Sequence, residues 1–281
     1  MKKITSIALT TICLQAWSLL NAPTAQAAPA ANPVLRLESD SGVATDAFNN
    51  VSSWTDQSGS SHDATQGDPA AKPILFSNVF NGLPGLRFDG STSFLNVAGT
   101  VLTSQQFSIF AVVTDTGTDF GFREIFSNWT GTNSVTSVFL GTFLMDPVKV
   151  RFTDNYGGDD DGQTGVGIIS TPASPFVLSG VSNSADVAVY QNEDLLDSRN
   201  TPLTTRDLTA PYVIGKQGDS IFEFWTGDIG AILVYDRELT NAERIQTTQY
   251  LESKFVPEPS TAAMLALGLT ALLSFRRRRS A

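Results

Sequence analysis

The sequence has little of the chemistry that redox enzymes and zinc-dependent enzymes use. Its 281 residues include one cysteine, Cys13, and one histidine, His62. One histidine without a partner cysteine does not supply a zinc site. A catalytic triad from Ser61, His62 and Asp63 also fails, because neighbouring residues of an extended chain point to opposite faces. We therefore expect His62 to be a turn residue that hydrogen-bonds to the backbone.

Positive charge is also scarce. The chain has 18 lysines and arginines against 28 aspartates and glutamates, a net charge of −10. Six of the basic residues are Lys2, Lys3 and Arg276–Arg279, and without them the 12 that remain give a net charge of −16. Such a surface repels nucleic acid and anionic lipid, so neither is an expected partner.

The N-terminus has the pattern of a secretory signal peptide. Two lysines after Met1 precede a mostly apolar stretch, residues 4–20, and Ala25-Gln26-Ala27 supplies small residues for cleavage. An uncleaved anchor is the alternative, which the small residues disfavour. Residues 1–27 are therefore the predicted signal peptide. Cys13 lies within them, so the mature chain has neither a disulfide nor thiol chemistry.

The C-terminus, VPEPSTAAMLALGLTALLSFRRRRSA (residues 256–281), combines three features in a fixed order. A Pro-Glu-Pro motif comes first, and then the apolar stretch 262–275, roughly 21 Å long as a helix. Such a stretch is shorter than the about 20 residues of a comfortable bilayer span, and a basic cluster after it stops transfer. The motif residues are Val256, Pro257, Glu258, Pro259, Ser260 and Thr261, and the stop-transfer residues are Arg276, Arg277, Arg278 and Arg279.

This tail resembles the PEP-CTERM sorting signal. The resemblance implies export by the general secretion machinery and then processing by an exosortase, a membrane protease-transpeptidase, in a Gram-negative bacterium that makes exopolysaccharide. It also implies transient association with the inner membrane through the C-terminal helix, followed by release to the cell surface or extracellular matrix. Residues 257–259 would then be a processing address rather than an active site.

Between the signals, residues 28–255 are patterned as one domain of β-strands. The segment VKVRF, residues 148–152, places its three apolar side chains on one face and its two basic side chains on the other. Turn-forming Gly, Asn, Asp, Ser and Pro residues separate such segments, as in β-sandwiches. Other short runs rich in β-branched and aromatic residues occupy 107–114, 137–143, 175–181, 186–192, 212–216 and 228–236.

One helix is predicted, over residues 240–255. Thr240 and Glu243 have the spacing of a capping box. Ile245, Tyr250 and Leu251 are expected to form its apolar side.

Four segments together resemble the LamG-like, concanavalin A-like family. They are SWTDQSGSSHDATQ (53–66), NGLPGLRFDGSTSFL (81–95), FSIFAVV (107–113) and GDIGAILVYDRELTNAERIQTTQYLESKF (227–255). The resemblance implies an all-β fold, an antiparallel two-sheet jelly-roll sandwich with one C-terminal helix. That fold carries lectins, adhesion modules and glycanases, so it does not define the function.

No strand carries the carboxylates that glycoside hydrolysis requires. Retaining enzymes need two carboxyl groups about 5 Å apart, and inverting enzymes need a somewhat larger separation. Neither Glu193-Asp194 nor the pair Asp236 and Glu238 forms part of an alternating acidic run on one strand. No catalytic residue is therefore predicted, although carboxylates from different strands could still meet in space.

Two weaker ligand sites remain open. Trp54 and Trp129 are candidates for stacking on sugar rings, and the alternative for both is core packing. The segment DNYGGDDDGQTG, residues 154–165, gathers acidic side chains and glycines that suit Ca²⁺, although an ordinary acidic turn has the same composition. Its candidate calcium ligands are Asp154, Asp159, Asp160 and Asp161.

The sequence therefore predicts an exported, non-catalytic binding or adhesion module whose ligand is a polysaccharide or another surface protein. A glycan-active hydrolase or lyase on the same sandwich is the first alternative. A purely structural matrix protein is the second, and it requires a featureless sheet face.

Overall fold

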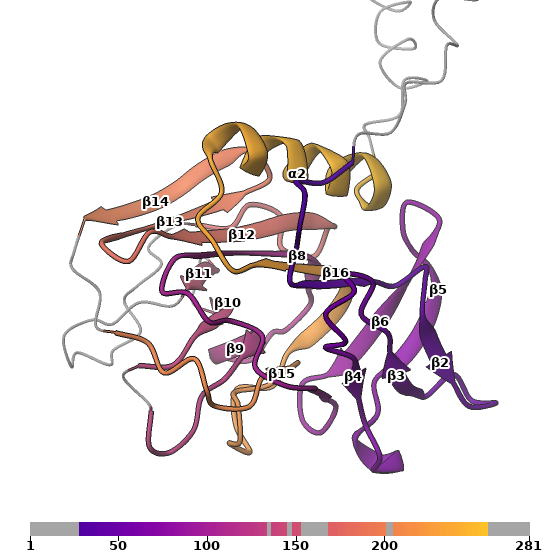
Figure 1. Cartoon of the computed structure of the whole chain (residues 1–281). Helices are drawn as coiled ribbons and strands as arrows, with labels where there is room; N and C mark the ends of the chain where they lie inside the picture. The colour runs from indigo at the N-terminus through magenta and orange to yellow at the C-terminus, as the bar shows by residue number, and fades with distance from the viewer. Residues whose placement is uncertain (1–27, 134–135, 145–147, 153–167, 201–204, 258–281) are drawn as a thin grey trace, which may run out of the picture.

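The computed structural model describes residues 28–133, 136–144, 148–152, 168–200 and 205–257. Within these ranges the chain forms two antiparallel β-sheets, A and B, and one α-helix (Figure 1). The predicted signal peptide, the loop 154–165 and the predicted sorting segment from residue 258 onward lie outside the described residues.

The long strand β16 is the centre of sheet A, because it pairs with three other strands. Along its whole length it pairs with β8, while its first part pairs with β6 and its last part with β1. A register shift between Ile229 and Ala231 marks the change of partner. The strand order is β14-β13-β12-β8-β16-β6-β5, with β1 beside β16. The bounds are β1 Leu35–Glu38, β5 Ile74–Phe80, β6 Leu83–Asp89, β8 Phe107–Asp115, β12 Phe176–Ser182, β13 Asp186–Gln191, β14 Asp194–Asn200 and β16 Thr226–Tyr235.

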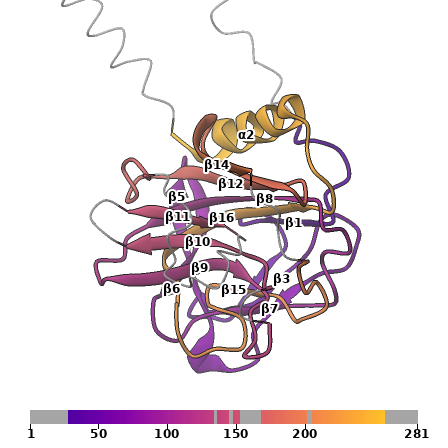
Figure 2. The same ribbon diagram turned by 90° about the vertical axis from the view of Figure 1, so that its left-hand side faces the viewer.

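Sheet B has the order β11-β10-β9-β15-β7-β4-β3-β2. It lies on the side of sheet A that faces away from the helix (Figure 2). The 3-10 turn η1, Pro69–Ala71, precedes β5. The bounds are β2 Val43–Thr45, β3 Val51–Trp54, β4 Ala64–Thr65, β7 Leu95–Val97, β9 Gly121–Ser127, β10 Phe139–Leu144, β11 Lys149–Phe152 and β15 Val213–Ile214.

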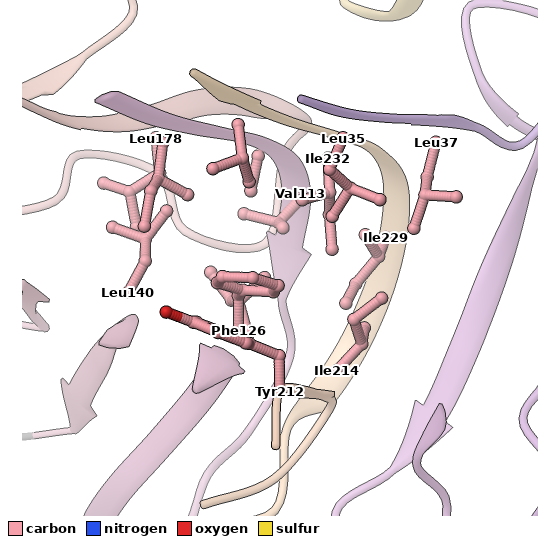
Figure 3. Packing of buried hydrophobic residues seen from close by; sticks show 14 of the residues in the cluster. Leu35, Leu37, Val113, Phe126, Leu140, Leu178, Tyr212, Ile214, Ile229 and Ile232 are labelled. Carbon is pink, nitrogen blue, oxygen red and sulfur yellow. The ribbon is translucent and has the colours of Figure 1, made fainter. Parts of the chain in front are cut away.

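The main core fills the space between the two sheets. Leu178 and Ile232 from sheet A point toward Leu140 and Phe126 from sheet B (Figure 3). The ring of Phe126 also stacks on Tyr212, with ring centroids 5.1 Å apart. All of these side chains are buried, so apolar area removed from water holds the sandwich together.

The helix α2, Asn241–Phe255, covers the outer face of sheet A (Figure 1). The capping box predicted from Thr240 and Glu243 is confirmed. A second apolar cluster, which includes Phe110, Leu233 and Leu251, lies between the helix and the sheet.

The buried side of α2 differs in part from the predicted one. Tyr250 and Leu251 are buried as expected, but Ile245 is only half-buried. The polar side chains Arg244 and Thr248 are buried instead. The apolar pattern of a helix does not by itself show which of its polar side chains will be buried against the sheet below.

The strands predicted from hydrophobic patterns are all present, and the predicted jelly-roll sandwich is confirmed. In β11, Val150 and Phe152 are buried in the core while Arg151 lies on the outer face, as the alternation indicated. The edge strand β5 was missed because it is largely exposed. β9 was missed because charged residues interrupt its apolar run.

Candidate functional site

The structure separates the two tryptophan candidates. Trp54 is fully buried, and its indole N–H donates to the carbonyl oxygen of Glu38, so it packs in the core and presents no surface to a ligand. Trp129 is partly exposed and remains a candidate. His62 contacts the carbonyl oxygen of Ala98 through Nδ1 at 2.7 Å, which confirms its expected bond to backbone.

The proposed calcium ligands Asp154, Asp159, Asp160 and Asp161 lie outside the described residues. Among the residues that the structure describes, no group of three or more histidine, cysteine or acidic residues has the arrangement of a metal site.

The outer face of sheet B brings together charged side chains that are far apart in the sequence. Glu124 on β9 and Arg151 on β11 both lie directly opposite Gly141 on the strand between them. Because Gly141 has no side chain, the two charged groups meet across β10. A Cβ at Gly141 would lie 2.2 Å from the backbone oxygen of Arg123, so a larger residue does not fit there.

A second carboxylate reaches the same guanidinium from the loop before β16. The Nη1 atom of Arg151 lies 3.5 Å from Oε1 of Glu124 and 2.7 Å from Oε2 of Glu223. The backbone fixes the loop as well, because the N–H of Glu124 donates to the carbonyl oxygen of Glu223 at 3.0 Å. Glu223 has a φ of 58°, in the left-handed region that costs a non-glycine residue about 1–3 kcal/mol. Its ion pair and backbone contact hold it there.

Burial gives Glu124 an unusual protonation state. Desolvation raises the pKa of Glu124 to about 8, and this effect exceeds the opposing influence of the nearby Arg151 charge. The neighbouring carboxylate of Glu223 raises the pKa further. Glu124 therefore holds its proton to a higher pH than an exposed glutamate does, and Arg151 forms its shorter ion pair with Glu223.

Phenylalanine rings surround these charges. The guanidinium of Arg151 lies 4.1 Å from the ring centroid of Phe122 and 4.8 Å from that of Phe139. Phe122 stacks on Phe143 at 4.4 Å, and the edge of Phe120 meets Phe143 at 5.2 Å. Phe120 is 76% exposed, so this aromatic series ends in solvent. We call the set the front-face cluster: Phe120, Phe122, Glu124, Phe139, Phe143, Arg151 and Glu223.

Sequence reasoning did not find this cluster. Glu124 and Glu223 belong to different elements, and no local spacing relates them. The available signal was the alternation in VKVRF, which placed Arg151 on the outer face. The candidate Trp129 lies close to the same loop, since its carbonyl oxygen accepts a hydrogen bond from the N–H of Asp219.

Solved structures share this architecture at low sequence identity, and together they define the fold as a jelly-roll β-sandwich. Domain 4 of AbnA, a GH43 extracellular arabinanase from Geobacillus stearothermophilus in complex with arabinotriose, matches with a TM-score of 0.51 and 13% identity, over 79% of this chain and 99% of that domain. The sialidase of Trypanosoma rangeli in complex with the inhibitor DANA matches with a TM-score of 0.56 and 13% identity, over 88% of this chain. The match spans only 39% of the sialidase. The binding domain of botulinum neurotoxin serotype D matches with a TM-score of 0.50 and 15% identity, over 78% of this chain and 51% of that one.

The C-terminal tail has a more specific counterpart. Residues 255–279 match the family described as the PEP-CTERM protein-sorting motif. The chain thus carries the signal of an exported protein that an exosortase processes and sorts to the cell surface. No curated protein matches the chain. Within the described residues, no helix has both the length and the apolar character that crossing a membrane requires.

Proposed function

We propose that the exported domain is a non-catalytic module that binds polysaccharide at the cell surface through the front-face cluster. The exposed ring of Phe120, beside the partly exposed ring of Phe122, offers apolar area on which a sugar ring can stack. Glu223 and Arg151 add hydrogen-bonding groups next to these rings. The complex of the similar arabinanase domain with arabinotriose supports a glycan as the ligand.

The observation that carries the non-catalytic assignment is the position of Arg151. A glycosidase holds its substrate between two carboxyl groups. In this protein a single guanidinium nitrogen contacts both Glu124 and Glu223, and Glu124 has no exposed surface. The space between the carboxyl groups is therefore filled by a side chain.

The binding assignment is tested by measuring retention of the purified protein on a panel of immobilised polysaccharides. Phe120→Ala should weaken binding about tenfold, because it removes most of the stacking area of a large apolar side chain. Phe48→Ala is the matched control, because Phe48 is 82% exposed but lies in the turn between β2 and β3. Equal binding by both variants would contradict the proposed surface. Retention on an immobilised surface protein, with none on any polysaccharide, would instead favour a surface protein as the ligand.

A glycan-active hydrolase or lyase is the alternative, and the raised pKa of Glu124, with the carboxylate of Glu223 nearby, is the feature that favours it. Such an enzyme would release reducing ends from a polysaccharide in the panel, and Glu124→Gln or Glu223→Gln would abolish the release. We expect no release from the unmodified protein.

A further inference from the structure

A pocket of about 360 Å³ lies on the helix side of sheet A, lined by residues of the first turn of α2 and of strands β13 and β14. Figure 1 shows α2 lying over this part of the sheet. This volume is within the range of small-ligand sites in proteins. Apolar side chains from β12, β13 and the segment before α2 form part of its wall. The polar lining consists of Asn183, Asp186, Tyr190, Ser198, Asn241 and Arg244, with Glu238 beside them.

Arg244 is the unusual member of this lining. Only 4% of it is exposed, and its guanidinium lies 3.8 Å from the ring centroid of Tyr190. Nε and Nη2 both donate to the neutral Oδ1 of Asn241, at 3.3 and 2.9 Å. Nη1 is buried and has no hydrogen-bond partner. None of the ion pairs among the described residues includes Arg244, so this buried cation lacks a counter-ion.

A buried cation without a counter-ion is unfavourable, and an anionic ligand group would relieve that cost. A carboxylate suits the position because the planar guanidinium offers paired N–H groups that match its two oxygens. The lining also carries negative charge, however. Asp186 has a buried, unpartnered Oδ1, and Glu238 is exposed beside it. These carboxylates disfavour a simple inorganic anion, but they can accept hydrogen bonds from hydroxyl groups.

We propose that this pocket binds a sugar that carries a carboxylate, of the uronic acid type. The carboxylate would bond to Arg244, and the hydroxyl groups would bond to Asp186 and to the neutral side chains of Asn183, Ser198 and Asn241. The site is separate from the front-face cluster, since the two lie on the outer faces of different sheets. This proposal therefore does not depend on the function proposed above, and either one can fail without the other.

Titration calorimetry of the purified protein with glucuronate and galacturonate tests the proposal, with glucose and glutamate as comparison ligands. We expect binding of at least one uronate, and binding of glucose that is about tenfold weaker or undetectable, because glucose lacks the charged group. Arg244→Gln should weaken uronate binding about tenfold or more. Glu238→Gln should strengthen it about twofold, because a like charge leaves an exposed position beside the ligand.

A weakening of uronate binding by Arg244→Gln and a strengthening by Glu238→Gln would together show that the charge of the ligand is recognised. Because Arg244→Gln removes a buried residue, thermal unfolding must show that it is folded, and Glu238→Gln changes only an exposed residue. Arg87→Gln is the matched control, because Arg87 also stacks on a ring, that of Phe76 at 4.1 Å, but pairs with Asp228 on another part of sheet A. We expect it to leave uronate binding unchanged.

The proposal would be overturned by equal binding of glucose and uronate, by uronate binding that Glu238→Gln weakens, or by the absence of any uronate binding. Preferential binding of glutamate would also overturn it, since a zwitterion would then be the better match to the mixed charges. Loss of binding to polysaccharide in Phe120→Ala, with uronate binding retained, would leave this pocket intact as a separate site.

Discussion

The ring of Phe255 meets the ring of Phe80 edge-on, with centroids 6.3 Å apart. Both side chains are fully buried, and Phe255 is the last residue of α2. The next residue, Val256, is the helix C-cap and also the first residue of the Val-Pro-Glu-Pro segment. The folded domain therefore reaches the first residue of the sorting motif, because Val256 itself packs against the apolar cluster that contains Phe80 and Phe255.

Processing should remove the tail without weakening the domain. We expect the mature protein from its native host to lack Arg276–Arg279, with cleavage near residues 257–259, because the matched motif lies there. Intact-mass measurement checks this, and a mature species that retains the arginines would contradict it.

The packing of Phe255 supplies a control for the expectation that loss of the tail does not destabilise the domain. Chains that end after residue 257 and the unprocessed chain should unfold at the same denaturant concentration. Phe255→Ala should lower the free energy of unfolding by about 3–5 kcal/mol, because it leaves a cavity beside Phe80. A tail deletion that is as damaging as Phe255→Ala would mean that the tail itself packs on the domain.

The inward face of β11 can be tested by truncation. Phe152 is 2% exposed and meets the ring of Phe107 at 6.0 Å. Phe152→Ala should cost about 3–5 kcal/mol in chemical denaturation. A loss below about 1 kcal/mol would show that β11 does not present this face to the core. Phe48→Ala, at an exposed position, is the control and should change stability little.

The raised pKa of Glu124 predicts a pH dependence of stability. Its pKa is raised from 4.5 to about 8 in the folded chain, so between these values the folded state binds a proton that the unfolded state has released. The contribution of Glu124 to stability is thus fully present below about pH 4.5 and is lost as pH rises through about 8.

Glu124→Gln should remove this contribution, because glutamine does not titrate. Urea unfolding of both proteins at several pH values between 4.5 and 9 measures it. The variant should become more stable relative to the unmodified protein as pH rises. Parallel stability profiles would show that the pKa of Glu124 is not raised in the folded chain.

Calcium binding at the acidic loop remains a prediction from composition. If Asp159, Asp160 and Asp161 bind the ion, tenfold excess calcium over the dissociation constant should stabilise the domain by about 1.4 kcal/mol. The melting temperature should then rise by a few degrees with calcium and little with magnesium. Changing these three residues to asparagine should abolish the rise. Identical melting in calcium and in chelator would leave the loop as an acidic turn.

The sequence by itself determined the features that depend on neighbouring residues. The order of motif, apolar stretch and arginines identified the sorting signal, and local spacing located the capping box at Thr240. The alternation in VKVRF assigned the faces of β11, because successive side chains of a strand point to opposite sides. Strand patterns of this kind predicted a β-sandwich with one helix, and the jelly-roll fold was implied by the resemblance of four segments to the LamG-like family.

Only the tertiary structure decided which outward side chains meet. Alternation places Arg151 on the outer face of sheet B but does not show that β10 presents Gly141 there, or that a distant loop brings Glu223 to the same guanidinium. Likewise, Arg244 has the sequence pattern of a solvated helix residue, and the sheet beneath α2 buries it against Tyr190. Strand register and layer packing pair residues far apart in the chain, and no local periodicity records those pairings.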